Sequence, residues 1–136
     1  MRNTSMISLV FLMACSGKGG DTGGSGIADP SYASDIQPIW DDNCISCHST
    51  VSADFGSLDL KNDSYDNIVG VVSAETSMDY VTAGDPDNSY LFKKLDGTSG
   101  DVSGGDPGQM PDDLPALSQA DQDTIKNWIA NGALNN

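Results

Sequence analysis

The chain contains very little histidine, cysteine and glutamate. Among its 136 residues there is one histidine, His48, and there are three cysteines and a single glutamate against 19 aspartates. Structural zinc is usually bound by four ligands from two separated pairs, which one histidine and three cysteines supply poorly. Ligation of one metal by two histidines of the same chain is excluded.

Basic residues are also scarce. Six lysines and arginines stand against 20 acidic residues, giving a formal net charge of -14. Nucleic acid is therefore not an expected partner, because phosphate binding requires clustered basic side chains. An acidic surface instead favours a basic partner protein, or serves to keep an exported protein soluble. We favour the solubility interpretation, with a basic partner as the alternative.

Long apolar runs are missing, and the one short run lies at the start of the chain. Residues 7–14 read ISLVFLMA and follow a single arginine at position 2. Such a run is too short to cross a bilayer but is typical of an export signal. The join Leu12-Met13-Ala14-Cys15 resembles the cleavage box of bacterial lipoproteins. The resemblance implies that residues 1–14 are a signal peptide and that Cys15 carries the lipid.

The predicted lipid would anchor the chain to a membrane, since two acyl chains are enough for stable attachment. Ser16 after the lipidated cysteine is compatible with sorting to the outer membrane, so we expect an exported periplasmic or cell-surface lipoprotein. The alternative is an uncleaved or lipid-free signal with an unrelated cysteine. Residues 15–29 are rich in glycine and serine and predict a flexible tether. Residues 30–136 would form one small domain.

Two helices are expected in the first half of this domain. The first would have Asp35 as its N-cap and Pro38 within its first turn, where a missing N–H is tolerated. A short second helix would cover about residues 64–69 and end near Gly70. The apolar face of the first helix would contain Ile36, Ile39, Trp40 and Cys44.

Two further helices are expected in the second half. One would begin at Asp87 or Asn88 and stop at Gly97. The last has a capping box of Ser118 and Asp121, and it would end at Gly132. Its apolar stripe is Ile125, Trp128 and Ile129. A long aspartate-, glycine- and proline-rich loop separates these two helices, and no convincing strand pattern appears, so the sequence predicts an all-α domain.

The five residues CISCH contain the only histidine and two of the three cysteines. The pattern C-x-x-C-H in an exported protein is the attachment motif of c-type haem. Cysteines three apart on a helical turn project from the same side, so Cys44 and Cys47 can both form thioethers at one edge of a porphyrin, and His48 can reach the iron. A redox dithiol, a zinc site and a plain disulfide are the weaker alternatives. Haem would also supply core that this small domain lacks.

The second axial ligand of the iron is less determined by the sequence. After removal of the signal, methionine remains only at Met78 and Met110; lysine, water or no ligand are the other possibilities. Met110 precedes Pro111, which disfavours helix and leaves Met110 extended in the long loop. It is also well separated in sequence from His48. We therefore favour Met110 over Met78.

The order of motifs resembles the class I cytochrome c fold, most closely the planctomycete-type cytochrome c domains. CISCH follows a first helix, Gly-Asp-Pro-x-x-Ser-Tyr-Leu opens another, and a Met-Pro loop precedes a final helix with Trp-Ile-x-x-Gly-Ala. The resemblance covers residues 32–134. It implies a small helical domain wrapped around one covalent haem c, with crossing of the first and last helices near Trp128. The implied ligand set is Cys44 and Cys47 as thioethers, His48 as the proximal ligand and Met110 as the distal ligand.

An iron closed by histidine and methionine has no open site, so the expected function is one-electron transfer to or from a redox partner protein. A haem-based sensor or peroxidase-like module with an open distal site is the alternative, and a haem-free lipoprotein is a third. For two further groups of residues, a structural role is favoured over a functional one. The aromatic residues Trp40, Tyr65, Tyr90 and Trp128 are expected in the core rather than on an electron path. Asp101, Asp106, Asp112 and Asp113 are expected on a solvated face rather than around calcium.

Overall fold

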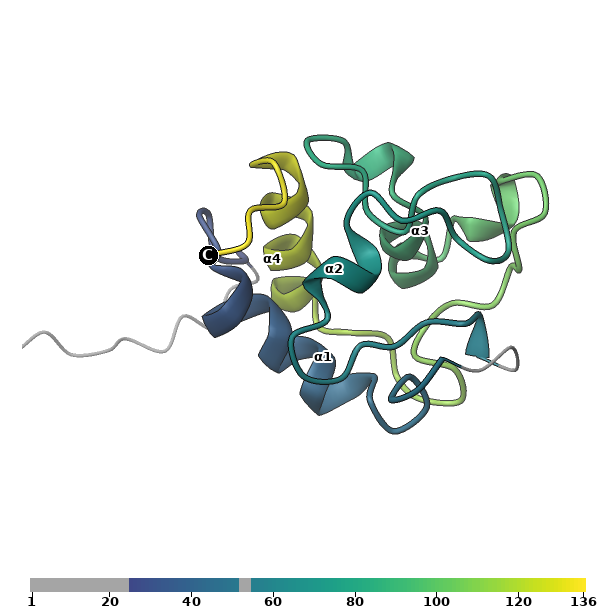
Figure 1. Ribbon diagram of the computed structural model, residues 1–136, viewed down its shortest axis with the longest axis horizontal. Helices are drawn as coiled ribbons and strands as arrows, with labels where there is room; N and C mark the ends of the chain where they lie inside the picture. The colour runs from purple at the N-terminus through teal and green to yellow at the C-terminus, as the bar shows by residue number, and fades with distance from the viewer. Residues whose placement is uncertain (1–24, 52–54) are drawn as a thin grey trace, which may run out of the picture.

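A computed structural model describes residues 25–51 and 55–136 of the chain. The predicted signal peptide, the predicted lipidation site Cys15 and most of the predicted tether lie outside the described residues. Within the described part the fold consists of short helices joined by long loops (Figure 1). The described residues contain no helix that is long and apolar enough to cross a membrane.

The elements follow one another without a strand in the described part, as predicted for an all-α domain, although Val69 with Val81 and Val72 with Asp79 form isolated bridges. In Figure 1, α1 and α4 lie toward one end of the molecule, α3 lies toward the other end, and α2 lies between α4 and α3 in this view. In chain order the elements are a π-helical turn η1 (Tyr32–Ile36), α1 (Gln37–Asn43), α2 (Tyr65–Ile68), a 3-10 turn η3 (Pro86–Asn88), α3 (Tyr90–Asp96), a 3-10 turn η4 (Ser99–Asp101) and α4 (Gln119–Ala130).

The first helical segment begins earlier than the sequence predicted. Asp35 is not its N-cap but lies inside the first turn, where its carboxylate accepts a hydrogen bond of 2.8 Å from the backbone N–H of Ser31. The free N–H groups of this first turn find partners at the other end of the chain. Tyr32 N donates to the side-chain oxygen of Asn136 at 3.0 Å, and Ala33 N donates to the Asn136 carbonyl at 3.1 Å. These contacts explain the earlier start, since the first N–H groups of a helix need such acceptors.

The third predicted helix begins later than expected, and the predicted start at Asp87 or Asn88 is wrong. Both residues belong to η3, in which the Asp85 carboxylate accepts a hydrogen bond from Asn88 N. Ser89 then adopts an extended conformation with ψ 109°, so the α-helix can start only at Tyr90.

The ends of the last two helices are confirmed where the signals are local. Gly97 ends α3 in the left-handed conformation with φ +80°, which glycine adopts without strain. Ser118 caps α4 by accepting a hydrogen bond of 3.1 Å from Asp121 N, and its hydroxyl donates to the Asp121 carboxylate. Gly132, with φ +102°, lies just beyond the end of α4.

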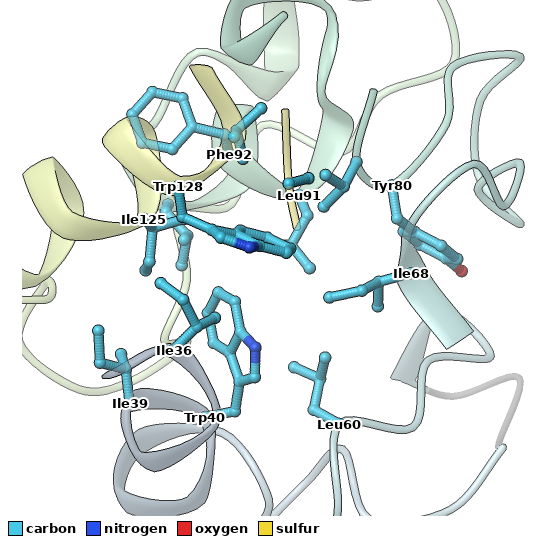
Figure 2. Close-up of a cluster of buried hydrophobic side chains, with 14 of the residues drawn as sticks. Ile36, Ile39, Trp40, Leu60, Ile68, Tyr80, Leu91, Phe92, Ile125 and Trp128 are labelled. Atoms are coloured by element: carbon cyan, nitrogen blue, oxygen red, sulfur yellow. The ribbon is translucent and has the colours of Figure 1, made fainter. Parts of the chain in front are cut away.

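One apolar cluster joins the first and last helical segments (Figure 2). The predicted burial of Ile36, Ile39 and Trp40 on one face is confirmed. Trp128 is 1 % exposed, its ring centroid lies 5.2 Å from that of Tyr32, and its Nε1 donates to the Leu134 carbonyl at 3.0 Å. The two segments therefore pack against each other through Trp128, which fixes the position of the chain that leaves α1.

Candidate haem site

The CISCH segment forms a tight turn directly at the end of α1. Cys44 is the C-cap residue, and its N–H donates to the Trp40 carbonyl at 2.8 Å. The Cys44 carbonyl then accepts from Cys47 N at 3.2 Å and from His48 N at 2.9 Å. Because Trp40 is fully buried in the core, this turn is attached to a rigid part of the domain.

The two thiols of this turn lie in different surroundings and are not joined by a disulfide. Cys44 is half-buried and Cys47 is exposed. Burial raises the pKa of the Cys44 thiol to about 12, and the neighbouring Cys47 adds to this effect. A redox-active dithiol requires a lowered thiol pKa, so the surroundings of Cys44 do not favour the redox interpretation.

The His48 side chain has an unsatisfied nitrogen. Its Nδ1 is buried and has no hydrogen-bond partner among the described residues, although the backbone is fixed by a 2.8 Å bond from Leu60 N to the His48 carbonyl. Burial lowers the pKa of His48, an effect that the nearby carbonyls of Leu58 and Phe55 partly oppose. Burial therefore favours the neutral imidazole, which is the form that binds metals. A buried polar atom without a partner is unusual. The unpartnered Nδ1 therefore agrees with a bound group that would contact the His48 ring.

His48, Cys44 and Met110 line a common cavity. The empty space between the lining residues amounts to about 540 Å³, part of which is open to solvent. A neighbouring hollow of about 710 Å³ is lined by these same three residues and also by Cys47. The four predicted haem residues are thus brought together. Most of the first cavity wall is apolar, with Trp40, Phe55, Leu58, Leu60, Leu91 and Leu95.

Met110 is held in this wall by the end of α3. Its N–H donates to the Lys94 carbonyl at 2.8 Å, and the preceding side chain, Gln109, donates to the Leu95 carbonyl at 2.7 Å. The peptide bond between Met110 and Pro111 is cis. The competing methionine, Met78, does not line the cavity; it closes a turn in which its carbonyl accepts from Ser73 N at 2.8 Å.

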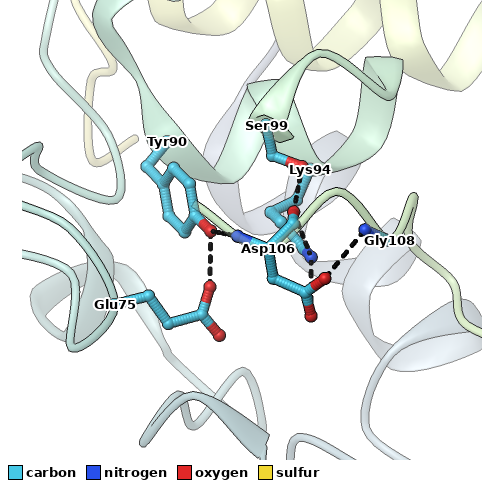
Figure 3. A network of polar contacts seen from close by, with 6 residues as sticks. All are labelled: Glu75, Tyr90, Lys94, Ser99, Asp106 and Gly108. Carbon is cyan, nitrogen blue, oxygen red and sulfur yellow. Dashed lines mark hydrogen bonds and ion pairs between the residues drawn. The ribbon is translucent and has the colours of Figure 1, made fainter. Parts of the chain in front are cut away.

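Sequence reasoning missed the polar part of the cavity wall, which is formed by Glu75, Tyr90 and Lys94 (Figure 3). The Tyr90 hydroxyl donates to the Glu75 carboxylate, and burial together with this bond raises the pKa of Tyr90 to about 12. Lys94 is 8 % exposed, so it brings a largely buried positive charge to the wall. Its ammonium donates to the Asp106 carbonyl at 3.2 Å. The one available signal was the spacing of Tyr90 and Lys94, which places both on one helix face.

The aspartates of the long loop lie on the surface, as expected for a solvated face. Asp101, Asp106, Asp112 and Asp113 are all exposed. In the described ranges, no three histidine, cysteine, aspartate or glutamate side chains are grouped so as to hold a metal ion. The Asp106 carboxyl has its pKa lowered by a hydrogen bond from Gly108 N and by the charge of Lys94.

A comparison with protein-family models returns one that is described as PccH cytochrome c and matches residues 31–136. The match covers the whole helical part and includes the CISCH turn, the cavity and Met110. No curated protein and no solved structure gives a significant match to the chain.

Proposed function

The chain belongs to the PccH cytochrome c family, and from that premise we propose that it is a one-electron carrier whose haem iron is held between His48 and Met110. Membership of the family implies a covalently attached haem c, and the C-x-x-C-H motif that binds it is present at residues 44–48. The observation that supports the proposed ligand pair is that both side chains line the same cavity.

Each residue of the site would have a distinct task. Cys44 and Cys47 would form the two thioethers, while His48 and Met110 would be the two protein ligands of the iron. The bound haem supplies the one-electron iron couple, and methionine ligation raises its reduction potential. The apolar walls would exclude water, and the anchoring of the CISCH turn to α1 and of Met110 to α3 would hold both ligands in place. Little then needs to rearrange when the charge of the site changes.

The alternative function is a sensor or peroxidase-like module in which the distal side of the iron is open. Glu75, the single glutamate, lies in the cavity wall and is the carboxylate that could act as an acid or base there. Its carboxylate accepts the hydrogen bond of Tyr90, however, and Met110 lies in the same cavity. These contacts favour the carrier. Carbon monoxide added to the reduced protein separates the two, because a closed iron leaves the absorption bands unchanged and an open iron shifts them.

We also propose that the carrier is an exported lipoprotein. Residues 1–14 would be the signal peptide, Cys15 the lipidated residue and residues 15–29 the tether, which supports a periplasmic or cell-surface location, most simply at the outer membrane. Replacement of Cys15 by serine should abolish incorporation of labelled fatty acid and release the protein from the membrane fraction. Incorporation that persists in that variant would contradict lipidation at Cys15.

The net charge of -14 supports a basic redox partner. Asp112 and Asp113 line the hollow that also contains Cys47, so negative charge lies beside the proposed attachment side of the haem. The rate of electron exchange with a cationic redox dye should fall as ionic strength rises, and a rate that is independent of salt would contradict the electrostatic proposal.

Within the cytochrome c fold, the Gly-Asp-Pro motif that starts at Gly84 and the Met110–Pro111 loop support a relationship to the planctomycete-type domains.

A further inference from the structure

The loop that carries Met110 is fastened to α3 at two places. One is Met110 itself, whose N–H donates to the Lys94 carbonyl at 2.8 Å. The other lies four residues earlier, at Asp106, where the side chains of Tyr90, Lys94 and Ser99 converge (Figure 3). We propose that this group, which we name the Asp106 clamp, is the positioning device that keeps Met110 at the iron. The inference rests on the proposed ligation by Met110.

The clamp holds the backbone of Asp106 rather than its side chain alone. The Asp106 N–H donates to the Tyr90 hydroxyl at 3.2 Å. The Asp106 carbonyl accepts from the Ser99 hydroxyl at 2.6 Å and from the Lys94 ammonium at 3.2 Å. The carboxylate adds an ion pair at 3.7 Å to Lys94, but at 60 % exposure this pair is screened by solvent. Both polar backbone groups of Asp106 are thus satisfied by side chains of α3 and η4.

The loop has little else to hold it in one shape. It contains three glycines between η4 and Met110, and glycine leaves a loop many alternative conformations. Gly105 lies so close to η4 that an added Cβ would be 2.1 Å from the Ser99 carbonyl oxygen. The clamp therefore presses the loop against η4 at a point where only glycine fits. Without it, the loop would be ordered by the contacts of Met110 and Gln109 and by the local hydrogen bond of 2.9 Å from Gly105 N to the Val102 carbonyl.

Lys94 links the two fastening points. Its carbonyl accepts the N–H of Met110, while its ammonium holds Asp106. Tyr90 lies one helical turn earlier and holds Asp106 from the other side. A loop that moves away from α3 at Asp106 therefore also pulls on the Met110 bond. The sulfur is expected to leave the iron more often when the clamp is weakened, and an added ligand then competes more easily.

The test compares variants of the mature holoprotein. Tyr90→Phe removes the hydroxyl that holds Asp106 N. Tyr65→Phe is the matched control, because within the described part of the chain the Tyr65 hydroxyl bonds only the Ala133 carbonyl, at 2.7 Å. Ser99→Ala weakens the clamp without contact to Glu75 or the cavity. Each ferric protein is titrated with imidazole, and the sulfur-to-iron charge-transfer band in the far red is recorded.

We expect the affinity for imidazole to rise about tenfold in Tyr90→Phe, which corresponds to about 1.4 kcal/mol, and several-fold in Ser99→Ala. The Tyr65→Phe control should retain the affinity of the wild type. Suppose that the wild type shows the charge-transfer band but the clamp variants bind imidazole no better than the control. That result would overturn the clamp and leave the ligation by Met110 standing. A wild type without that band would overturn the ligation by Met110 and the clamp with it. If Tyr90→Phe fails to fold, Ser99→Ala decides the question.

Discussion

Trp128 joins the last helix to the segment that carries the CISCH turn, so its replacement tests the role of this contact. The indole is 1 % exposed, contacts Tyr32 with ring centroids 5.2 Å apart, and lies 6.4 Å from the Tyr65 ring. Its Nε1 donates to the Leu134 carbonyl at 3.0 Å. Trp128→Phe keeps a ring at this position, whereas Trp128→Ala removes nearly all of these contacts.

The expected losses differ between the two variants. Trp128→Ala should lower the free energy of unfolding by about 3–5 kcal/mol, the usual result of truncating a buried tryptophan. Trp128→Phe should lower it by about 1–2 kcal/mol, since the hydrogen bond to Leu134 contributes about 1 kcal/mol and the smaller ring leaves part of the space empty. A small domain has only about 5–15 kcal/mol in total, so Trp128→Ala leaves it near the limit of folding.

Urea unfolding of the holoprotein, followed by far-ultraviolet circular dichroism, measures these losses. The slope of the transition should stay the same in Trp128→Phe, so that the midpoint alone reports the change. The melting temperature should fall by about 4–8 °C for each kcal/mol. A loss below about 1 kcal/mol in Trp128→Ala would refute the reasoning, because it would mean that the first and last helical segments are held together by other contacts.

Three further predictions follow from the site and the core. Met110→Leu should bind carbon monoxide when reduced and should lower the reduction potential, whereas Met78→Leu should behave as the wild type; equal behaviour of the two would contradict the choice of Met110. Replacing Asp112 and Asp113 by asparagine should raise the potential in a redox titration, by at most on the order of tens of millivolts because exposed charges are screened, and an unchanged or lowered potential would count against their influence. Burial raises the pKa of Tyr32 from 10.0 to about 12, so the unfolded state loses this proton first and stability should fall as the pH rises through that interval; Tyr32→Phe should make the fall less steep in urea titrations at each pH, and an identical slope would contradict this.

The helix ends could be predicted where the signal is local. Gly97 and the pair of Ser118 and Asp121 act on backbone groups within a few residues, so a single sequence is enough. The start of the first helix could not be predicted in this way. Its N–H groups are satisfied by Asn136, which is about one hundred residues away and is brought there only by the complete fold.

The same distinction between local and tertiary signals applies to the candidate site. The attachment motif is contiguous, and a methionine before a proline in a long loop marks Met110, so both are visible in the sequence. The polar wall is different, because Glu75 comes from one loop while Tyr90 and Lys94 come from α3. Lys94 in particular would be expected in solvent on charge alone, yet the fold buries it against Asp106. Only tertiary packing brings these groups to the cavity.

The most direct test of the central claim is the absorption spectrum of the matured protein when oxidised, when reduced, and when reduced under carbon monoxide. An electron carrier closed by His48 and Met110 predicts sharp c-type bands on reduction that carbon monoxide leaves unchanged. Reduced bands that shift under carbon monoxide would contradict the closed site, and the sensor or peroxidase-like function would then take its place.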